Sequence, residues 1–396
     1  MTPDLLFPGP QTGNATKRAT ESTYDFLNRV TRPEMAAPRQ VLEEWFAHWP
    51  ADDRKDLRGR LKAKDAGQFV GAFWELYLHE LHRRLGFECQ RDPVLPDTTR
   101  RPDFLVSRPG NPKSSFYLEA TVVDYARNEA SLRKRQELVL EMIEAAYHPD
   151  FAIRVHQLAA GDSQPSRREV VGAIEQWFAT LDHEAEQRRV GELGRADEMI
   201  ALGKGWRLRA LPYPRPEQSR GDRSFPTIAT RSGGGMINEP PTILDDLRDK
   251  ASRYGRPDRP YVIAALCARE FATELDIEQA LYGPEVIKVA VGPGGPQTGV
   301  ARIDRDPKGL WQRDEQQTAT RVSAVLSAIQ LHPWSIASVP LTLWLNPWAT
   351  RRLTASLPWA TVSGDLAANA IVRADGEREP REFLDLPERW PYSPAG

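Results

Sequence analysis

The stretch "RRPDFLVSRPGNPKSSFYLEATVV", residues 100–123, decides the fold because it has the pattern of a β-hairpin that carries two acids. Two runs of strand-forming residues, 103–108 and 115–123, flank "PGNPKS", whose Pro, Gly and Asn favour a turn. Opposed residues of an antiparallel hairpin have a constant index sum, and a turn centred in this loop gives a sum of about 222. The predicted register therefore places Asp103 opposite Glu119.

Strand alternation places Glu119 on one face of the second strand, together with Tyr117 and Thr121. The other face is apolar and carries Phe116, Leu118, Ala120 and Val122. Two like charges directly opposed are destabilising unless a positive charge lies between them, and a divalent cation with hard oxygen ligands would supply it. The pattern thus predicts a metal site at Asp103 and Glu119.

Each acid taken alone also has an ordinary structural explanation. Asp103 can open a turn after a proline, and Glu119 can point outward and pair with Arg100 or Arg101. A third acid, Glu75 on the preceding predicted helix, favours a shared site over these two explanations.

The bulk composition is that of a globular protein. The chain has 396 residues, of which 40% are hydrophobic and 27% charged, and its formal net charge is −2. A site for a polyanion must therefore be a local basic patch. The two cysteines, Cys89 and Cys267, have no zinc-binding spacing. No signal peptide or membrane span is expected, so the chain is predicted to be cytoplasmic and without a membrane partner.

Helix and strand patterns lie on both sides of the hairpin. "AGQFVGAFWELYLHELHRRLGFE", residues 66–88, is the clearest helix, and Gly86 is its predicted stop. A charged helix follows the hairpin over about residues 128–146, and "FAIRVHQL", residues 151–158, is a predicted strand. A second α/β region, with "TILDDLRDKASRYG" as a helix and "PYVIAAL" as a buried strand, begins at about Gly203.

An acid-bearing helix followed by "RPDF" and "YLEAT" resembles the PD-(D/E)XK nuclease superfamily, whose core runs helix, three strands, helix, strand. "GAFWELYLHELHRRLGF" also resembles the opening helix of Mrr-like members. The resemblance covers about residues 68–160 and maps the family's acids onto Glu75, Asp103 and Glu119. It implies an α/β protein with a restriction endonuclease-like core, a central mixed sheet flanked by helices. The helix and strand patterns outside this core add an N-terminal helical extension and a second α/β region.

With this resemblance, the sequence predicts three parts. Residues 1–66 are a tail, flexible or loosely docked to about residue 22, and a helical extension. Residues 67–195 are the nuclease core, and residues 196–396 are a C-terminal α/β domain that recognises the target or a partner.

The implied reaction is metal-assisted hydrolysis of phosphodiester bonds in nucleic acid, with DNA favoured and defence against foreign DNA as an analogy. Mg²⁺ or Mn²⁺ would be held by Asp103, Glu119, the carbonyl of Ala120 and Glu75. The alternative is a catalytically degenerate module of the same fold that binds nucleic acid or a protein partner. A homodimer is left open.

One position departs from the family pattern. The family's lysine should stand two residues after Glu119, where this chain has Thr121. A lysine would orient the attacking water and offset charge at the phosphorus, whereas a threonine hydroxyl supplies no cation. Lys134 on the next predicted helix and Lys113 in the hairpin loop are candidates for the lysine role, and Gln136 is a further helix residue that could touch the site. Otherwise Thr121 is a common strand residue in a weakened site.

Several other stretches of the sequence carry weaker signals. Residues 83–135 contain eleven Lys/Arg and seven Asp/Glu, which suits a phosphate-binding surface and also a plain solvated face. "HELH" at residues 79–82 lacks the zinc spacing of i, i+4, and "SGGGM" at residues 232–236 lacks the end of a P-loop. "LRDKASRYG" draws attention to Lys250 and Tyr254, although a charged helix covering a buried strand explains them equally well.

Overall fold

The computed structural model describes residues 5–18, 21–123, 127–189, 197–221, 226–231, 239–269, 272–292, 295–314, 316–365 and 370–392. The chain divides into two compact units. The main unit comprises Met1–Thr16, Glu21–Asp124 and Asn238–Gly396, and the inserted unit comprises Lys17–Thr20 and Tyr125–Ile237. In sequence, the inserted unit interrupts the main unit directly after the predicted hairpin.

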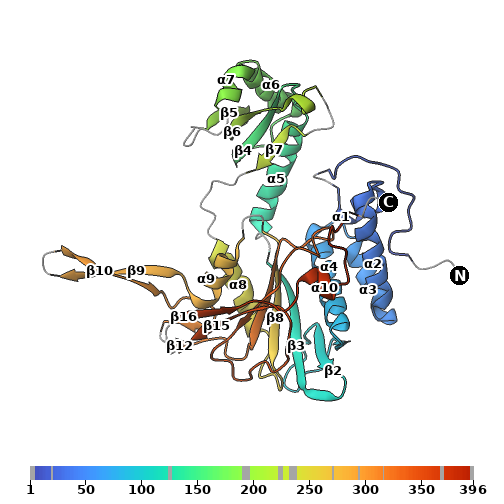
Figure 1. The fold of residues 1–396 in the computed structure, drawn as a ribbon, viewed down its shortest axis with the longest axis vertical. Helices are drawn as coiled ribbons and strands as arrows, with labels where there is room; N and C mark the ends of the chain where they lie inside the picture. The colour runs from blue at the N-terminus through green and yellow to red at the C-terminus, as the bar shows by residue number, and fades with distance from the viewer. Residues whose placement is uncertain are drawn as a thin grey trace. The chain divides into compact units, whose positions relative to one another are not determined.

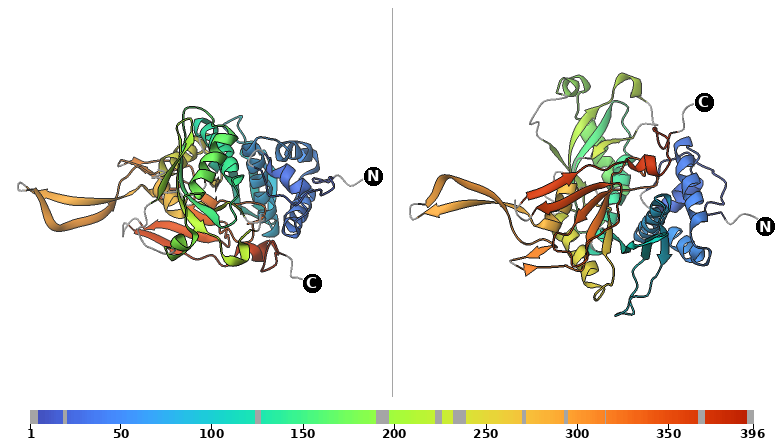
Figure 2. Two further views of the ribbon diagram at one scale, coloured as in Figure 1. Left: turned by 90° about the horizontal axis from the view of Figure 1, so that it is seen from above. Right: turned by 60° about the horizontal axis from the view of Figure 1, so that its bottom comes forward.

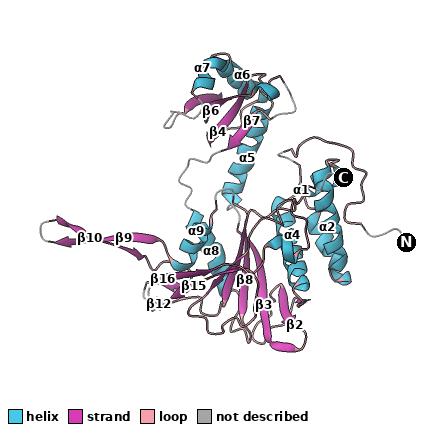
Figure 3. Ribbon diagram, viewed as in Figure 1, coloured by secondary structure: helices cyan, strands magenta, loops and turns pink. Residues whose placement is uncertain are grey.

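The main unit begins with helices and is built on a large mixed sheet (Figures 1 and 3). The helical elements are α1 (Thr23–Arg29), η1 (Pro33–Met35), α2 (Ala36–His48), η2 (Ala51–Asp53), α3 (Arg54–Leu61) and α4 (Ala66–Arg84). The sheet has the order β1-β2-β3-β8-β13-β14-β15-β16. Its strands are β1 (Glu88–Arg91), β2 (Phe104–Arg108), β3 (Asn111–Val123), β8 (Tyr261–Cys267), β13 (Ala324–Ile329), β14 (Thr342–Leu345), β15 (Ala360–Asp365) and β16 (Ala370–Ala374). This confirms the expectation of an α/β protein with a central mixed sheet flanked by helices.

The hairpin of β2 and β3 has the predicted register. Phe104 pairs with Leu118 and Val106 pairs with Phe116 in an antiparallel ladder, so the pairs keep the predicted index sum. The turn is shorter than expected, since Arg108 already pairs with Asn111 across Pro109 and Gly110. Asp103 directly precedes β2, one step beyond the first pair, and this places it beside Glu119 and Ala120.

The segment after β3 differs from the prediction. β3 pairs in parallel with β8, and Glu119 lies opposite Ile263. The helix that precedes β8 is α8 (Glu239–Ser252). The predicted helix and strand after the hairpin do form, as α5 (Arg127–Glu144) and β4 (Phe151–Ala159), but both belong to the inserted unit. The main unit therefore runs helix, three strands, helix, strand through α4, β1, β2, β3, α8 and β8.

The two faces of the main sheet carry separate hydrophobic clusters. On one face Phe116 and Leu118 pack with α1 to α4, and on the other Tyr117 packs with α8 and with α9 (Glu274–Tyr282). This confirms the predicted alternation along β3. The face that carries Glu119 is thus the face that α8 covers.

The N-terminal segment is more firmly held than the sequence suggested. Leu6 and Phe7 are buried, and their backbone N–H groups donate to the carboxylate of Glu43 at 2.8 and 2.6 Å. The hydroxyl of Tyr24 donates to the carbonyl of Leu6 at 2.8 Å. A composition rich in Pro and Gly did not reveal that two apolar residues anchor this segment.

The inserted unit is a smaller α/β structure. Its sheet has the order β5-β6-β4-β7, with β5 (Glu198–Gly203), β6 (Trp206–Pro214) and β7 (Ile228–Arg231), and its helices are α5, α6 (Arg167–Phe178) and α7 (His183–Arg188), with a short turn η3 (Glu217–Ser219). A hydrophobic cluster of its own includes Ile153, Val170 and Trp206. The expected division at residues 66 and 195 differs from the two units, because strand pairing joins segments far apart in the chain. The boundary at 195 itself lies outside the described residues, as does "SGGGM".

A two-stranded ribbon extends from the main unit (Figures 1 and 2). It consists of β9 (Glu285–Gly292) and β10 (Gly295–Arg305), and it is followed by the short pair β11 (Gln312–Arg313) and β12 (Gln316–Gln317). At its base Gly283 has a φ of 90°, and a Cβ there would lie 1.9 Å from the carbonyl oxygen of Asp306, so this glycine permits a close backbone approach. The last helix is α10 (Pro380–Phe383). Among the described residues, no helix combines the length and the apolar character that a membrane crossing needs.

Candidate functional site

Glu119 is the centre of a charged cluster on β3. Its side chain is only 3% exposed, yet both carboxylate oxygens are engaged. Oε1 accepts hydrogen bonds from Nζ of Lys250 at 2.8 Å and from Nη1 of Arg253 at 2.6 Å. Oε2 accepts from the phenol of Tyr254 at 2.5 Å. Two cations and a hydroxyl therefore stabilise an acid that would otherwise be costly to bury.

The helix α8 and the residues after it supply all three partners of Glu119. Lys250, Arg253 and Tyr254 are three and four positions apart, which places them on one side of the helical path. Ile243, Leu247 and Ala251 on α8 pack into the hydrophobic cluster of this sheet face and hold the helix against β3 and β8. Lys250 Nζ also lies 3.5 Å from the carbonyl oxygen of Ala120.

Tyr254 holds Glu119 as a hydrogen-bond donor. Burial and the charge of Glu119 raise the pKa of the phenol, so the proton stays on the oxygen. The same hydroxyl lies 2.9 Å from the carbonyl of Arg101, which precedes Asp103 in the chain. Tyr254 thus links the end of α8 to both acid-bearing segments.

Asp103 lies beside Glu119, as the register predicts. Its Oδ2 accepts a hydrogen bond from the backbone N–H of Ala120 at 2.7 Å. Burial, followed by the charges of Glu119 and Glu75, raises the pKa of Asp103 to about 7, whereas the Ala120 N–H and Lys250 act in the opposite direction. The carboxyl therefore sits in an environment with excess negative charge, which a metal cation would relieve.

Glu75 is close enough to influence Asp103, but its carboxylate is paired elsewhere. Nη1 and Nη2 of Arg60 donate to its two oxygens at 2.6 and 2.7 Å. Arg60 lies on α3 and Glu75 on α4, so this bidentate pair joins two helices. Glu75 would have to exchange this partner to act as a metal ligand.

The remaining predicted site residues take different places. Thr121 is buried two residues after Glu119 on the same face of β3, as expected. Lys134 and Gln136 lie on α5 in the inserted unit, where the Gln136 amide donates to the carbonyl of Leu158 at 2.8 Å. Lys113 is exposed on β3. The lysine that reaches Glu119 is Lys250 instead.

The oxygen atoms of Asp103, Glu119 and the Ala120 carbonyl are the hard donors that Mg²⁺ prefers, so these residues fit a magnesium site. Glu119 would then release at least one of its three partners. In the conformation described, Glu75, Asp103 and Glu119 do not form a compact group of three ligand atoms within 4.8 Å.

Among the described residues, the compact group of that kind is Glu44, His48 and Glu80. Glu80 is fully buried, and its carboxylate accepts hydrogen bonds from Arg83 at 2.8 Å and Arg84 at 2.7 Å, while His48 Nδ1 lies at 3.0 Å. The arginines already neutralise this acid, so we interpret the group as an ion-pair network between α2 and α4.

A polar cavity opens beside Lys250. It has a volume of about 610 Å³ and is lined by Arg100, Arg101, Asp249, Lys250, Ser252 and Arg253. Four of these side chains are cations and one is an acid. This Lys250 cavity is therefore suited to an anionic ligand next to Glu119.

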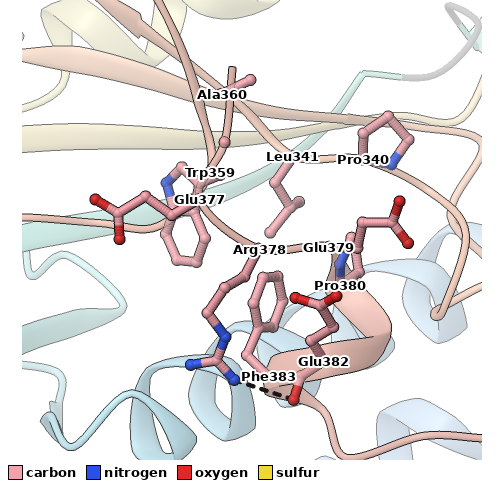
Figure 4. A pocket seen from close by; sticks show the side chains of 11 residues that line it. Pro340, Leu341, Trp359, Ala360, Glu377, Arg378, Glu379, Pro380, Glu382 and Phe383 are labelled. Carbon is pink, nitrogen blue, oxygen red and sulfur yellow. Dashed lines mark hydrogen bonds between the residues drawn. The ribbon is translucent and has the colours of Figure 1, made fainter. Parts of the chain in front are cut away.

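A second cavity, of about 240 Å³, lies near the C-terminus and is more apolar (Figure 4). Trp359, Phe383 and Leu341 line it, and Arg378 at its rim donates to the carbonyl of Glu382 at 3.0 Å. Glu377, Glu379 and Glu382 also line it, beside one cation, Arg378. Trp311, Trp344 and Trp359 are buried and serve packing in this part of the main unit.

The histidines of "HELH" belong to the core. His79 packs against Trp49 and Phe104, and His82 is completely buried against aromatic rings. Burial lowers the pKa of each histidine to about 4, so both are neutral at physiological pH. They do not reach Glu119, which lies on the other face of the sheet.

Lys250 and Tyr254 stood out in the sequence but were not expected at the site, and Arg253 was not expected at all. The available signal was the spacing of three polar residues on one side of a helix that precedes a buried strand.

Comparison with protein-family models, curated proteins and solved structures finds no match for this chain.

Proposed function

We propose that the chain is a metal-dependent nuclease that hydrolyses phosphodiester bonds, with DNA as the favoured substrate and Asp103, Glu119 and Lys250 at its centre. The single observation that carries this proposal is the 2.8 Å contact between Lys250 Nζ and Glu119 Oε1. It supplies the cation that Thr121 cannot supply.

The order of elements in the main unit supports a restriction endonuclease-like core. The resemblance requires helix, three strands, helix, strand, and α4, β1 to β3, α8 and β8 run in this order once the inserted unit is set aside. The acid at the start of β2 and the acid in the middle of β3 then occupy the places of the family's acids. In this proposal, α8 and β8 take the positions that the sequence assigned to α5 and β4.

Each residue of the site has a distinct role in the proposed reaction. Asp103, Glu119 and the Ala120 carbonyl would hold Mg²⁺ or Mn²⁺, which supplies a polarised phosphate and an acidified water when bound. Lys250 stabilises negative charge at the phosphate and orients the water by hydrogen bonding. Arg100, Arg101 and Arg253 hold the substrate phosphates around the Lys250 cavity.

The competing function is a degenerate module that binds nucleic acid without cleaving it. One observation favours it: both carboxylate oxygens of Glu119 already accept hydrogen bonds, from Lys250, Arg253 and Tyr254, as in a structural ion-pair cluster. In such a module the basic cavity would bind phosphates and the acids would serve only the fold.

The deciding experiment measures metal binding by calorimetry and cleavage of plasmid and single-stranded substrates in parallel. We expect Mg²⁺ or Mn²⁺ to bind the wild-type protein and to support cleavage, and Asp103→Asn to lose both. Glu388→Gln is the matched control, because Glu388 is an exposed acid outside the site. Nucleic-acid binding that survives chelation, without cleavage by the wild type, would establish the degenerate module instead.

A further inference from the structure

A third cavity, the arginine cavity, lies against the end of α8. It has a volume of about 190 Å³. Its charged lining consists of Arg248, Arg313 and Arg321, and no acid lines it. The rest of the lining is small or apolar and includes Leu310, Ala251 and Thr318.

The cations of the arginine cavity are poorly neutralised by the protein. Among the residues that the structure describes, Arg248 has one carboxylate neighbour, Asp245, at 3.6 Å, and that acid is exposed. No described carboxylate lies within ion-pair distance of Arg313 or Arg321. Three guanidinium groups around one small cavity repel one another, and an anion bound between them would relieve the repulsion.

The arginine cavity adjoins the Lys250 cavity at the end of α8. Ser252 lines both this cavity and the Lys250 cavity. Nη1 of Arg321 donates to the carbonyl of Tyr254 at 2.7 Å, and the phenol of that tyrosine holds Glu119. One turn of helix thus presents Lys250 to one cavity and Arg248 to the other.

We propose that the arginine cavity binds a second phosphate of the nucleic-acid strand whose scissile phosphate lies in the Lys250 cavity. This inference rests on the proposed function and specifies the substrate as a strand rather than a single nucleotide. Guanidinium groups suit phosphate because their N–H donors match its oxygens in pairs. Leu310 and Ala251 in the lining offer apolar surface for contact with the sugar next to that phosphate.

Arg321 also has a structural task, because it caps carbonyl groups of Tyr254 and Gly255. The variant that tests the inference is therefore Arg313→Gln, whose side chain is exposed and has no described carboxylate partner. Arg389→Gln is the matched control, since it removes one exposed arginine that lines neither cavity. Arg313→Lys keeps the charge.

The experiment is the anisotropy of a fluorescein-labelled oligonucleotide titrated with full-length protein in EDTA, at several salt concentrations. Losing one phosphate contact lowers the slope of log affinity against log salt concentration by roughly one. The ratio of wild-type affinity to Arg313→Gln affinity should therefore fall by about threefold between about 50 and about 200 mM salt. We expect Arg313→Lys to retain most of the affinity and Arg389→Gln to match the wild type.

Equal binding by Arg313→Gln and Arg389→Gln would overturn the inference, and so would the absence of any oligonucleotide binding. Parallel cleavage assays with Mg²⁺ separate this result from failure of the proposed function. Wild-type cleavage with no effect of Arg313→Gln on binding would remove only the second phosphate site. Arg313-dependent binding without cleavage by the wild type would retain that site and remove the nuclease.

Discussion

Nζ of Lys250 lies 2.8 Å from Oε1 of Glu119, although 131 positions separate the two residues in the sequence. The inserted unit occupies most of that interval, so the contact depends on α8 returning to β3 after the interruption. The cation that Thr121 does not provide is thereby supplied by the helix that covers the strand.

Lys250→Met should abolish most of the proposed cleavage. Removing one group that stabilises transition-state charge costs roughly 10²- to 10³-fold in kcat. Adding Thr121→Lys to this variant should restore part of the rate, because residue 121 lies on the same face of β3 as Glu119. The measurement is single-turnover cleavage of a labelled substrate, with Lys113→Met as the control for loss of an exposed lysine.

If Lys250→Met cleaves as fast as the wild type, Lys250 is a structural partner of Glu119 and nothing more. A double variant that binds substrate normally and stays inactive would show that a lysine on β3 cannot replace one on α8. Circular dichroism and urea unfolding of each variant distinguish both results from loss of the fold.

Tyr254→Phe should destabilise the main unit without changing its shape. The phenol donates to a buried carboxylate, and hydrogen bonds to charged groups contribute about 1.5–3 kcal/mol. We expect the free energy of unfolding in urea to fall by this amount, with an unchanged dependence on urea concentration. Tyr392→Phe is the control, because Tyr392 is 62% exposed. Equal stability of Tyr254→Phe and wild type would mean that Lys250 and Arg253 suffice to hold Glu119.

Asp103→Asn should raise stability at alkaline pH while it removes metal binding. Burial and the neighbouring acids raise the pKa of Asp103 to about 7 from 3.8, so the folded state binds this proton more tightly than the unfolded state. Wild-type stability therefore falls as pH rises between these two values, and an uncharged Asn avoids that loss. Each kcal/mol gained corresponds to about 2–4 °C in Tm.

The comparison is made by thermal unfolding of both proteins at acidic and alkaline pH without metal. We expect the Tm difference in favour of Asn to grow with pH, and saturating Mg²⁺ to raise the Tm of the wild type alone. A difference that does not change with pH would mean that Asp103 titrates normally.

The hairpin was predictable because its determinants are local. The Pro and Gly of the turn and the alternation along residues 115–123 fix which residues oppose one another. The constant index sum of opposed residues then places Asp103 next to Glu119. The partners of the hairpin were not predictable in this way. The sequence pattern of a helix followed by a strand does not reveal which sheet the strand joins. The pattern of α5 and β4 was assigned to the core because it directly follows the hairpin in the chain.

The cation at Glu119 was also not predictable from the local sequence. The position two residues after Glu119 holds Thr121, which carries no cation. The next helix in the sequence offers Lys134, but this lysine lies in the inserted unit. Only the pairing of β3 with β8 indicates that α8 is the covering helix. Long-range pairing is thus the information that the local pattern lacks.

Acid should destabilise the main unit through His82, which is completely buried on α4 against Phe87, Phe116 and Trp359. Its Nδ1 lies 2.7 Å from the carbonyl of Leu78, and burial lowers its pKa to about 4 from 6.5. The unfolded state therefore binds a proton between these values while the folded state does not. The free energy of unfolding is therefore unaffected by His82 above the unfolded pKa and decreases as pH falls toward the folded pKa. The decrease due to this group is on the order of 3 kcal/mol.

Urea unfolding at pH values across this window measures the effect. His82→Phe keeps the aromatic contacts and has no proton to bind, so its stability should depend less steeply on pH than that of the wild type. His79, whose pKa burial also lowers to about 4, should preserve part of the slope. His332→Gln, at an exposed position, is the control for the loss of one histidine ring. An unchanged slope in His82→Phe would mean that acid opens the core around His82 before this histidine titrates.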